Sequence, residues 1–217
     1  MKIDLENVLP AEIERRSFEI IEQEMNNRIL DPDKAPIIKR VIHTSADFEY
    51  VDSLVFSENV VEQALAAIKR GACIVTDTEM GKAGINKKVL AKYGGEVHCY
   101  MADEEVARSA KINGSTRATA SIDKAALLDK EVIFAVGNAP TALVRLYELI
   151  AEKKIKPALV IGVPVGFVNV VQSKELIIKS EVPYIVARGR KGGSNVAAAI
   201  CNALLYLVDE TRGADKA

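Results

Sequence analysis

The sequence predicts an α/β fold: a doubly wound, mainly parallel six-stranded sheet with helices on both faces. The chain has 217 residues, of which 49% are hydrophobic, enough to bury one substantial core. From residue 51 onward, short β-rich runs alternate with stretches of helical periodicity, a pattern typical of a parallel sheet covered by helices. No repeat or linker interrupts this alternation. We therefore expect a single domain over residues 1–217, with N-terminal helices in 1–50 and the sheet core in 51–209.

The first expected helix covers residues 10–26, because Pro10 suits a first helical turn and an apolar stripe follows it. The stripe consists of Ile13, Ile20, Ile21 and Met25. Ser17 lies on the same stripe. Its hydroxyl either bonds to the backbone of its own helix or lines a pocket.

The second expected helix covers residues 35–45 and turns Ile37, Ile38, Val41 and Ile42 inward. Arg40 and His43 lie three residues apart on its other side. His43 is near the helix C-terminus, where the dipole favours the imidazolium, whereas the Arg40 cation opposes protonation unless a bound polyanion lies between them. His43 is thus either a general acid or base, or a surface residue.

The remaining elements alternate between strand and helix. Six strands are expected at 51–56, 72–76, 96–101, 131–136, 158–162 and 184–187. The helices between and after them are expected at 59–70, 87–93, 103–111, 122–128, 140–153, 168–180 and 194–208.

Composition excludes several classes of protein. Lys and Arg total 29 and Asp and Glu total 30, so the net charge of −1 provides no bulk positive charge for binding nucleic acid. The longest apolar stretches, 158–171 and 196–208, are shorter than the roughly 18 residues that a membrane span needs. Residues 1–6 lack the apolar core of a secretory signal. We expect a cytoplasmic protein that binds neither nucleic acid nor a membrane.

Metal and nucleophile chemistry also lack support. The three cysteines are too far apart for a disulfide framework or a zinc site, and we expect reduced, mostly buried thiols at Cys73, Cys99 and Cys201. His98 falls in an expected strand and is interpreted as a strand or core residue. There is no carboxylate cluster at ligand spacing and no GxSxG elbow, so neither a protein-held metal nor a Ser/His/Asp triad is expected.

Four loops follow expected strands at the carboxyl edge of the sheet, where doubly wound folds bind ligands. They cover residues 76–81, 137–141, 162–167 and 188–194. Their glycines permit close backbone approach, and the helix N-termini after them present N–H groups to an anion. None contains a GxGxxG, GxxxxGKS or GxxxxGKT motif. Each is either a site loop or a tight strand-to-helix turn.

The loop at 188–194 has the most specific chemistry. Three cations, Arg188, Arg190 and Lys191, precede two glycines and a serine at an expected helix start. That combination suits a carboxylate or phosphate, and a solvated turn is the alternative. A second basic candidate is Arg117, which otherwise is an exposed residue after a helix cap.

Six blocks, taken in order, resemble the precorrin-8X methylmutase family over nearly the whole chain. They are RSFEII at 16–21, RVIHTSAD at 40–47, TDTEM at 76–80, GNAPTAL at 137–143, GVPVGFV at 162–168 and GRKGGSN at 189–195.

The resemblance implies an isomerase of corrin-ring (vitamin B12) biosynthesis that moves a methyl group from ring carbon C-11 to C-12. The transfer is intramolecular, so no cofactor is implied. The resemblance also implies a homodimer with sites near its interface, a catalytic role for His43, and substrate contacts from Ser17 and Arg40. We expect His43 to act as a general acid in a 1,5-sigmatropic shift, by protonating or hydrogen-bonding a ring nitrogen.

The implied substrate is precorrin-8X or cobalt-precorrin-8, a flat tetrapyrrole with several carboxylate arms. Such a ligand needs an apolar slot rimmed by cations and helix N-termini. Arg40, Arg117, Arg190 and Lys191 are candidate carboxylate partners, and the N–H groups of Gly192, Gly193 and Ser194 form a further anion seat. The other candidate binding residues lie in the loops: Thr76, Thr78, Met80, Ser115, Thr116, Asn138, Ala139, Thr141, Gly166 and Phe167, with Pro164 as a further ring contact.

Two alternatives stay open at this point. One is a carrier that binds the tetrapyrrole without isomerising it, and the other is a nucleotide-dependent α/β enzyme, suggested by topology alone. The sequence does not decide between a cobalt-containing and a metal-free substrate.

Overall fold

A computed structural model of the chain describes residues 6–26 and 28–209. Residues 1–5, used above to argue against a secretory signal, lie outside this range, as do the ends of the expected 1–217 domain. The strands are β1 (Leu54–Phe56), β2 (Cys73–Thr76), β3 (Val97–His98), β4 (Val132–Val136), β5 (Leu159–Gly162) and β6 (Tyr184–Ala187). The helices are η1 (Pro10–Glu12), α1 (Ile13–Glu24), α2 (Ala35–Ser45), α3 (Tyr50–Ser53), α4 (Val60–Lys69), α5 (Glu79–Gly84), α6 (Lys87–Ala91), α7 (Glu104–Ile112), α8 (Arg117–Ala125), α9 (Pro140–Ala151), α10 (Val170–Ile178) and α11 (Ser194–Val208).

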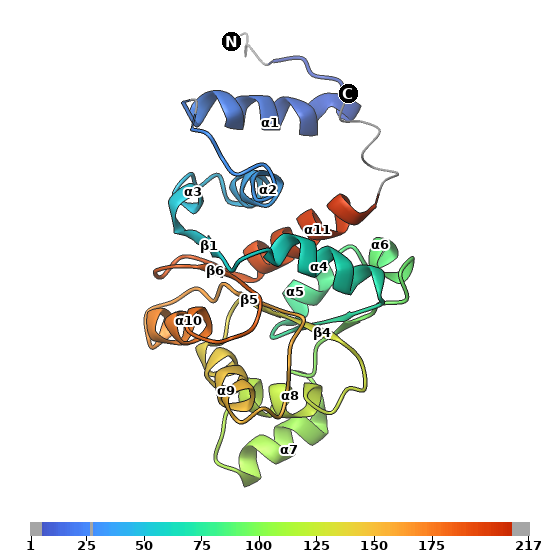
Figure 1. Cartoon of the computed structure of the whole chain (residues 1–217), viewed down its shortest axis with the longest axis vertical. Helices are drawn as coiled ribbons and strands as arrows, with labels where there is room; N and C mark the ends of the chain where they lie inside the picture. The colour runs from blue at the N-terminus through green and yellow to red at the C-terminus, as the bar shows by residue number, and fades with distance from the viewer. Residues whose placement is uncertain (1–5, 27, 210–217) are drawn as a thin grey trace, which may run out of the picture.

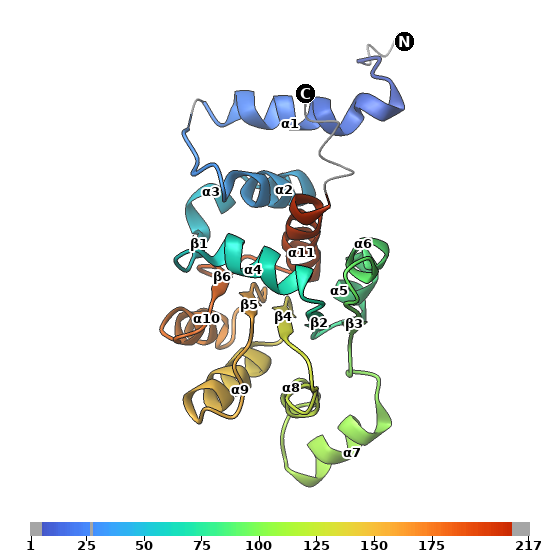
Figure 2. The same cartoon turned by 45° about the vertical axis from the view of Figure 1, so that its right-hand side comes forward.

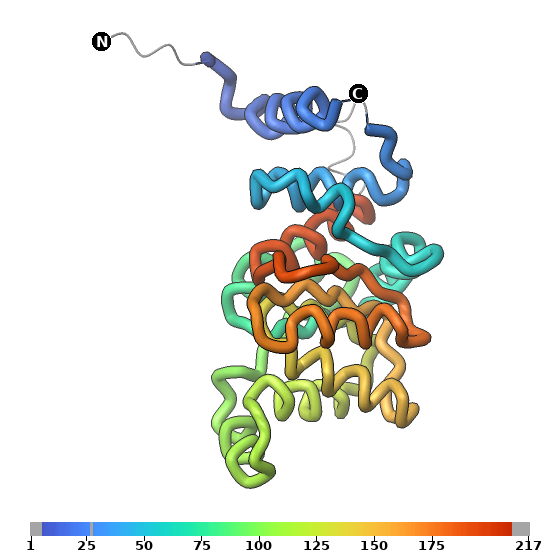
Figure 3. Tube along the Cα trace, turned by 90° about the vertical axis from the view of Figure 1, so that its left-hand side faces the viewer, coloured from blue at the N-terminus to red at the C-terminus, as the bar shows by residue number. Residues whose placement is uncertain are grey.

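The predicted fold class is confirmed. The six strands form one sheet in the order β1-β6-β5-β4-β2-β3, and every pairing is parallel except that of β1 with β6. Helices cover both faces: α4 and α11 lie on one side of the sheet, and α8, α9 and α10 lie on the other (Figures 1 and 2). Figure 3 shows α2 and then α1 as further layers outside the first face.

Strand residues point alternately into two cores. In β4, Ile133 and Ala135 join the core under α2, α4 and α11, whereas Phe134 and Val136 join the core under α8, α9 and α10. Both sides of the strand are therefore apolar, as expected for the centre of a parallel sheet. The buried faces of β4, β5 and β6 make a rigid platform below the loops at their carboxyl ends.

Four expected element boundaries are wrong. Residues 51–53 are helical, because the Asp47 carboxylate accepts the Glu49 N–H and turns the chain into α3. The strand expected at 96–101 has only two residues, because β3 is an edge strand and its partner β2 ends at Thr76. The helix expected at 122–128 begins at Arg117, since the Thr116 hydroxyl caps it.

The fourth difference is a helix that periodicity did not indicate. Residues 79–84, expected to be loop, form α5, and the Thr78 hydroxyl caps it by accepting the Gly81 N–H. Two glycines in six residues lower its helix propensity, so the cap rather than the composition marks this helix.

The order of the strands locates a crevice. After β2 the chain forms β3 at one edge, and it then returns to place β4, β5 and β6 on the other side of β2. The direction of winding thus reverses between β2 and β4. In doubly wound sheets the ligand binds at the carboxyl ends of the strands at such a reversal.

Candidate active site at the carboxyl edge of the sheet

Asp77, directly after β2, fastens the loop that follows β4. Its side chain is buried, and its carboxylate accepts the backbone N–H groups of Gly137 (2.8 Å), Asn138 (2.8 Å) and Ala139 (2.6 Å). Burial raises the pKa of the Asp77 carboxyl, and the three N–H groups act in the opposite direction. The predicted binding residues Asn138 and Ala139 are therefore held at the reversal point by a buried carboxylate.

Close backbone contacts join this loop to the others. A Cβ atom on Gly137 would lie 2.6 Å from the Cα atom of Ser194, so glycine alone lets the loop after β4 meet the start of α11. The hydroxyl oxygens of Thr78 and Ser194 are 2.7 Å apart. Gly166 donates its N–H to the carbonyl of Arg190 at 3.1 Å. The loops 76–81, 137–141, 162–167 and 188–194 thus form one continuous structure, here called the rim.

One part of the predicted anion seat is wrong. The Gly193 N–H donates to the carbonyl of Val163 at 2.9 Å, because the last loop lies against the end of β5, and it is not available to a ligand. Over residues 6–26 and 28–209, the N–H groups of Gly192 and Ser194 have no acceptor. These two remain as donors at the start of α11.

Beside the rim, an open groove of about 290 Å³ lies between α2 and α11. It is lined by Arg40, His43, Thr44, Gly84, Asn195, Ala198, Ala199, Asn202 and Tyr206. The structure therefore brings the two predicted N-terminal residues, Arg40 and His43, into the same cavity. Asn195 joins that cavity to the rim, because it directly follows Ser194.

His43 is exposed to the groove and is held on one side by an aromatic ring. Its imidazole stacks on Phe18 of α1, with the ring centroids 5.3 Å apart and the planes inclined by 26°. It lies in the last turn of α2, which ends at Ser45.

Arg40 lies between two aromatic rings. Its guanidinium carbon is 4.9 Å from the centroid of Phe18 and 5.1 Å from that of Tyr206, and Glu14 pairs with it. The Glu14 carboxylate therefore offsets the charge of the Arg40 guanidinium.

The Ser17 hydroxyl bonds to the backbone of its own helix, which is the first of the two alternatives given above. Its hydroxyl donates to the carbonyl of Ile13 at 2.8 Å, one turn back in its own helix. Ser17 is not among the residues that line the groove between α2 and α11.

The predicted cations of the rim differ in their partners. The Lys191 ammonium pairs with Asp47 (2.6 Å) and Glu49 (2.9 Å). These pairs raise the pKa of Lys191, and the pair with Lys191 lowers the pKa of the Asp47 carboxyl. Arg190 is exposed and lies 5.5 Å from the ring centroid of Phe167. Neither Arg190 nor Arg117 forms an ion pair with any residue that the structure describes. These two guanidinium groups are the cations most open to an anionic ligand.

The predicted hydroxyl residues fall into two groups. The Thr76 hydroxyl is buried and donates to backbone carbonyls of Thr78 (3.0 Å) and His98 (3.3 Å), so its role is to hold the rim. The hydroxyl oxygens of Thr116 and Thr141 are 2.9 Å apart, which brings the starts of α8 and α9 together. Ser115 is exposed beside them. The Arg117 segment thus adjoins the loop after β4.

The predicted apolar contacts also divide. Phe167 and Met80 are 81% and 72% exposed, so both side chains are accessible to a flat ligand. Pro164 is buried and packs within the fold.

His98 lies in a strand as expected, but it is half-buried at the edge of the sheet and does not belong to the core, whereas the cysteines are mostly buried as expected. His98 lies in β3 and stacks on Tyr100 at 5.9 Å. All three cysteines are free; Cys73 and Cys201 are buried, and Cys99 is half-buried.

Of the nine residues that line the groove, only Arg40 and His43 were predicted, although a signal exists for three of the others, which lie on α11. Asn195, Asn202 and Tyr206 recur at seven and four residues along α11, which places them on one helix face. Polar groups at this spacing in an otherwise apolar helix indicate a face that lines a cavity. Asn202 is fixed by the Asn86 N–H (2.8 Å) and the Gly84 carbonyl (2.8 Å).

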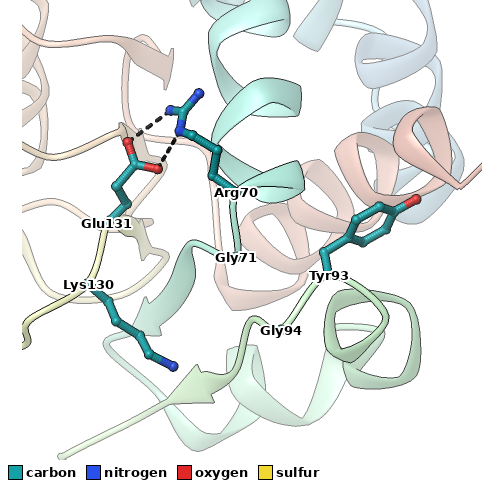
Figure 4. A pocket seen from close by; sticks show the side chains of 6 residues that line it. All are labelled: Arg70, Gly71, Tyr93, Gly94, Lys130 and Glu131. Carbon is teal, nitrogen blue, oxygen red and sulfur yellow. Dashed lines mark hydrogen bonds and ion pairs between the residues drawn. The ribbon is translucent and has the colours of Figure 1, made fainter.

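A second pocket lies at the opposite, amino edge of the sheet (Figure 4). It is lined by Arg70, Gly71, Tyr93, Gly94, Lys130 and Glu131, and the Arg70 guanidinium pairs with both oxygens of Glu131 at 2.8 Å. Glu131 already neutralises the charge of Arg70 in this pocket, and none of the predicted site residues lines it.

A family model described as "Precorrin-8X methylmutase" matches residues 12–207 of this chain. The chain is 48% identical over 207 residues to the Salmonella typhimurium "Cobalt-precorrin-8 methylmutase", covering 93% of this chain and 97% of the relative. It is 45% identical over 202 residues to a protein of the same name from Priestia megaterium, covering 93% and 90% of the two chains.

The fold is similar to that of a solved structure, a precorrin-8X methylmutase from Thermus thermophilus. The TM-score is 0.83 at 41% identity, with 92% of this chain and 98% of the other covered. In the described part of this chain, no helix is long and apolar enough to cross a membrane.

Proposed function

The chain belongs to the precorrin-8X methylmutase family, and we propose that its reaction takes place in the groove with His43 as the general acid. It is an isomerase, an intramolecular methyltransferase of vitamin B12 biosynthesis. The observation that carries the residue assignment is the convergence of Arg40 and His43, from α2, with the N-terminal end of α11 and the rim.

In the proposed step, the bond between the methyl carbon and C-11 breaks while the bond to C-12 forms. No external methyl donor enters. The His43 imidazolium protonates or hydrogen-bonds a ring nitrogen near the migrating group and withdraws electron density from the conjugated system, which lowers the barrier to migration. The Phe18 ring fixes the plane of the His43 imidazole.

The rim binds the macrocycle by its carboxylate arms. Arg40 acts at the groove, Arg190 acts on the rim, and Arg117 acts at the start of α8 beside the rim; neither Arg190 nor Arg117 has a carboxylate partner in the described chain. Lys191 and the N–H groups of Gly192 and Ser194 add a cation and two neutral donors. Phe167 and Met80 supply exposed apolar surface for the ring faces.

The substrate we propose is cobalt-precorrin-8, because both curated relatives described above carry that name. The cobalt belongs to the substrate. We place the enzyme in the cytoplasm, since its three free cysteines fit a reducing compartment.

We further propose a homodimer. The groove of about 290 Å³ is at the lower limit of pockets that enclose even a drug-sized ligand, and a tetrapyrrole is larger. Val165, Phe167 and Val168, in and directly after the rim loop 162–167, expose apolar surface. A second copy over this surface would complete the enclosure.

The proposal is tested by absorption spectroscopy of the purified protein mixed with cobalt-precorrin-8 or with metal-free precorrin-8X. Methyl migration changes the conjugation and therefore the spectrum, so we expect conversion of the cobalt form to the product spectrum. Conversion of only the metal-free form would contradict the proposed substrate. A bound but unchanged pigment would identify a carrier instead of an enzyme.

A further inference from the structure

Lys174, in the middle of α10, is the one lysine among the fully buried large side chains of the described residues. Its exposed fraction is 0%. Its ammonium donates to two backbone carbonyls, those of Gly189 and Lys191, each at 2.8 Å. Both carbonyls belong to residues 188–193, here called the basic loop, which is the part of the rim that carries Arg188, Arg190 and Lys191.

Together with Gly166, Lys174 binds three consecutive carbonyls of the basic loop. The carbonyl between the two that Lys174 holds, that of Arg190, accepts the Gly166 N–H at 3.1 Å. The carbonyl side of this segment is therefore anchored to α10 and to the loop after β5. The Arg190 side chain and the Gly192 N–H are left without a carboxylate or carbonyl partner in the described residues, and they are free to meet a ligand.

If the side chain at position 174 served only to fill space, it would not need an amine. Burying an ammonium is unfavourable, and an apolar side chain of similar length would fill the same volume. Burial lowers the pKa of Lys174 to about 8, so its ammonium is disfavoured relative to that of an exposed lysine. In residues 6–26 and 28–209, no carboxylate is hydrogen-bonded to its Nζ, and the neighbouring Glu175 pairs with Arg188 at 3.3 Å. Among the described residues, the two loop carbonyls are the only hydrogen-bond partners of the Lys174 amine.

We propose that Lys174 is a positioning residue for substrate binding: it anchors the basic loop so that Arg190 and the Gly192 N–H face the substrate carboxylates. This inference rests on the proposed function, in which the basic loop binds those arms. Lys174 itself touches no substrate.

The test compares the wild-type enzyme with Lys174→Met, which keeps the side-chain length and removes the donors. Lys179→Met is the matched control, because Lys179 is an exposed lysine at the end of the same helix. Trypsin cleaves after arginine and lysine, so mass spectrometry of new termini after Arg188, Arg190 and Lys191 reports how often the folded loop opens. KM and kcat are measured on the same samples with cobalt-precorrin-8.

Removing both donors should increase cleavage in the basic loop by at least about tenfold and raise KM by about tenfold or more, with kcat changed much less. Lys179→Met should change neither quantity. Unchanged cleavage in Lys174→Met would overturn the proposal. Increased cleavage with an unchanged KM would overturn it as well, since Lys174 would then be only structural. Failure of the wild-type enzyme to convert substrate is a separate result, which contradicts the proposed function itself.

Two further measurements keep the test independent of the folding of one variant. Lys174→Gln retains a shorter donor and should fall between wild type and Lys174→Met in both readouts. In the wild-type enzyme, brief acetylation should label Lys179 and leave Lys174 unlabelled. Equal labelling of the two lysines would contradict an anchored amine.

Discussion

Arg40 shows how one side chain is prepared for its ligand before the ligand arrives. Phe18 and Tyr206 hold the guanidinium between their rings, so few of its rotamers remain to be lost on binding. A planar guanidinium in this position matches a substrate carboxylate better than a lysine ammonium would.

Arg40→Ala should therefore weaken substrate binding, by about 1.5–3 kcal/mol for the loss of one charge-assisted hydrogen bond. The measurement is a titration with cobalt-precorrin-8, followed by absorption. Arg15→Ala is the control, because Arg15 is an exposed arginine on α1 that pairs only with Glu12 and Glu19 among the described residues. Equal affinity of Arg40→Ala and wild type would contradict the assigned role.

Asp77 is a second residue whose importance lies in its partners. Asp77→Ala leaves three backbone N–H groups without their acceptor, and the unfolding free energy should fall by about 3–5 kcal/mol. Chemical denaturation measures this change. Asp129→Ala, at an exposed aspartate, should change the unfolding free energy by less than about 0.5 kcal/mol. A loss no larger than that control would show that water replaces the carboxylate.

The lowered pKa of buried Lys174 leads us to expect that the unfolding free energy depends on pH. Its pKa is about 8 in the folded chain against an ordinary 10.5, so between these values the folded state has released a proton that the unfolded state still binds. The unfolding free energy of wild type should therefore increase relative to that of Lys174→Met as the pH rises from about 8 to 10.5. Denaturation of both proteins at several pH values checks this, and parallel pH profiles would contradict it.

At the scale of elements, the sequence predicted best where apolar periodicity is continuous. The helix expected at 194–208 and the strand expected at 184–187 have the observed bounds, because neighbouring elements bury one full face of each. Residues 79–84 and 117–121 were missed as helix, because their starts depend on single caps, Thr78 and Thr116.

The site was predictable in part. The four loops meet as expected, because strand direction alone brings the loop positions to one edge. Arg40 and His43 share a groove for a different reason, the packing of α2 on α11. Asn195, Asn202 and Lys174 were not foreseen. A buried lysine has the same place in the sequence pattern as an exposed one, and only the packing of α10 against the basic loop distinguishes them.

The close contact between the loop after β4 and the start of α11 can be tested by a substitution at Gly137. Gly137→Ala adds a methyl group that would lie 2.6 Å from the Ser194 Cα atom, so the loop after β4 must separate from the start of α11. We expect a lower melting temperature, equivalent to about 1–3 kcal/mol, and a higher KM. Calorimetry and steady-state kinetics measure both. A variant with wild-type values would show that the two loops move apart without consequence for binding.

At the scale of the whole molecule, the open groove predicts an assembly of two chains. One chain has a mass of 23.6 kDa, so light scattering during size-exclusion chromatography should give about twice that mass. Phe167→Glu places a charge on the exposed apolar segment 165–168 and should shift the population toward the single-chain mass. A wild-type species of 23.6 kDa with full activity would contradict the dimer.

The most direct single measurement is a single-turnover absorption time course with cobalt-precorrin-8 and wild type, His43→Ala or His98→Ala. A positioned general acid contributes roughly 10²–10⁴-fold, so His43→Ala should bind the pigment and convert it slower than wild type by about that factor. His98→Ala, at the histidine in β3 outside the groove, should convert it at the wild-type rate. An unchanged rate in His43→Ala would contradict the assignment of His43 as the acid that assists methyl migration.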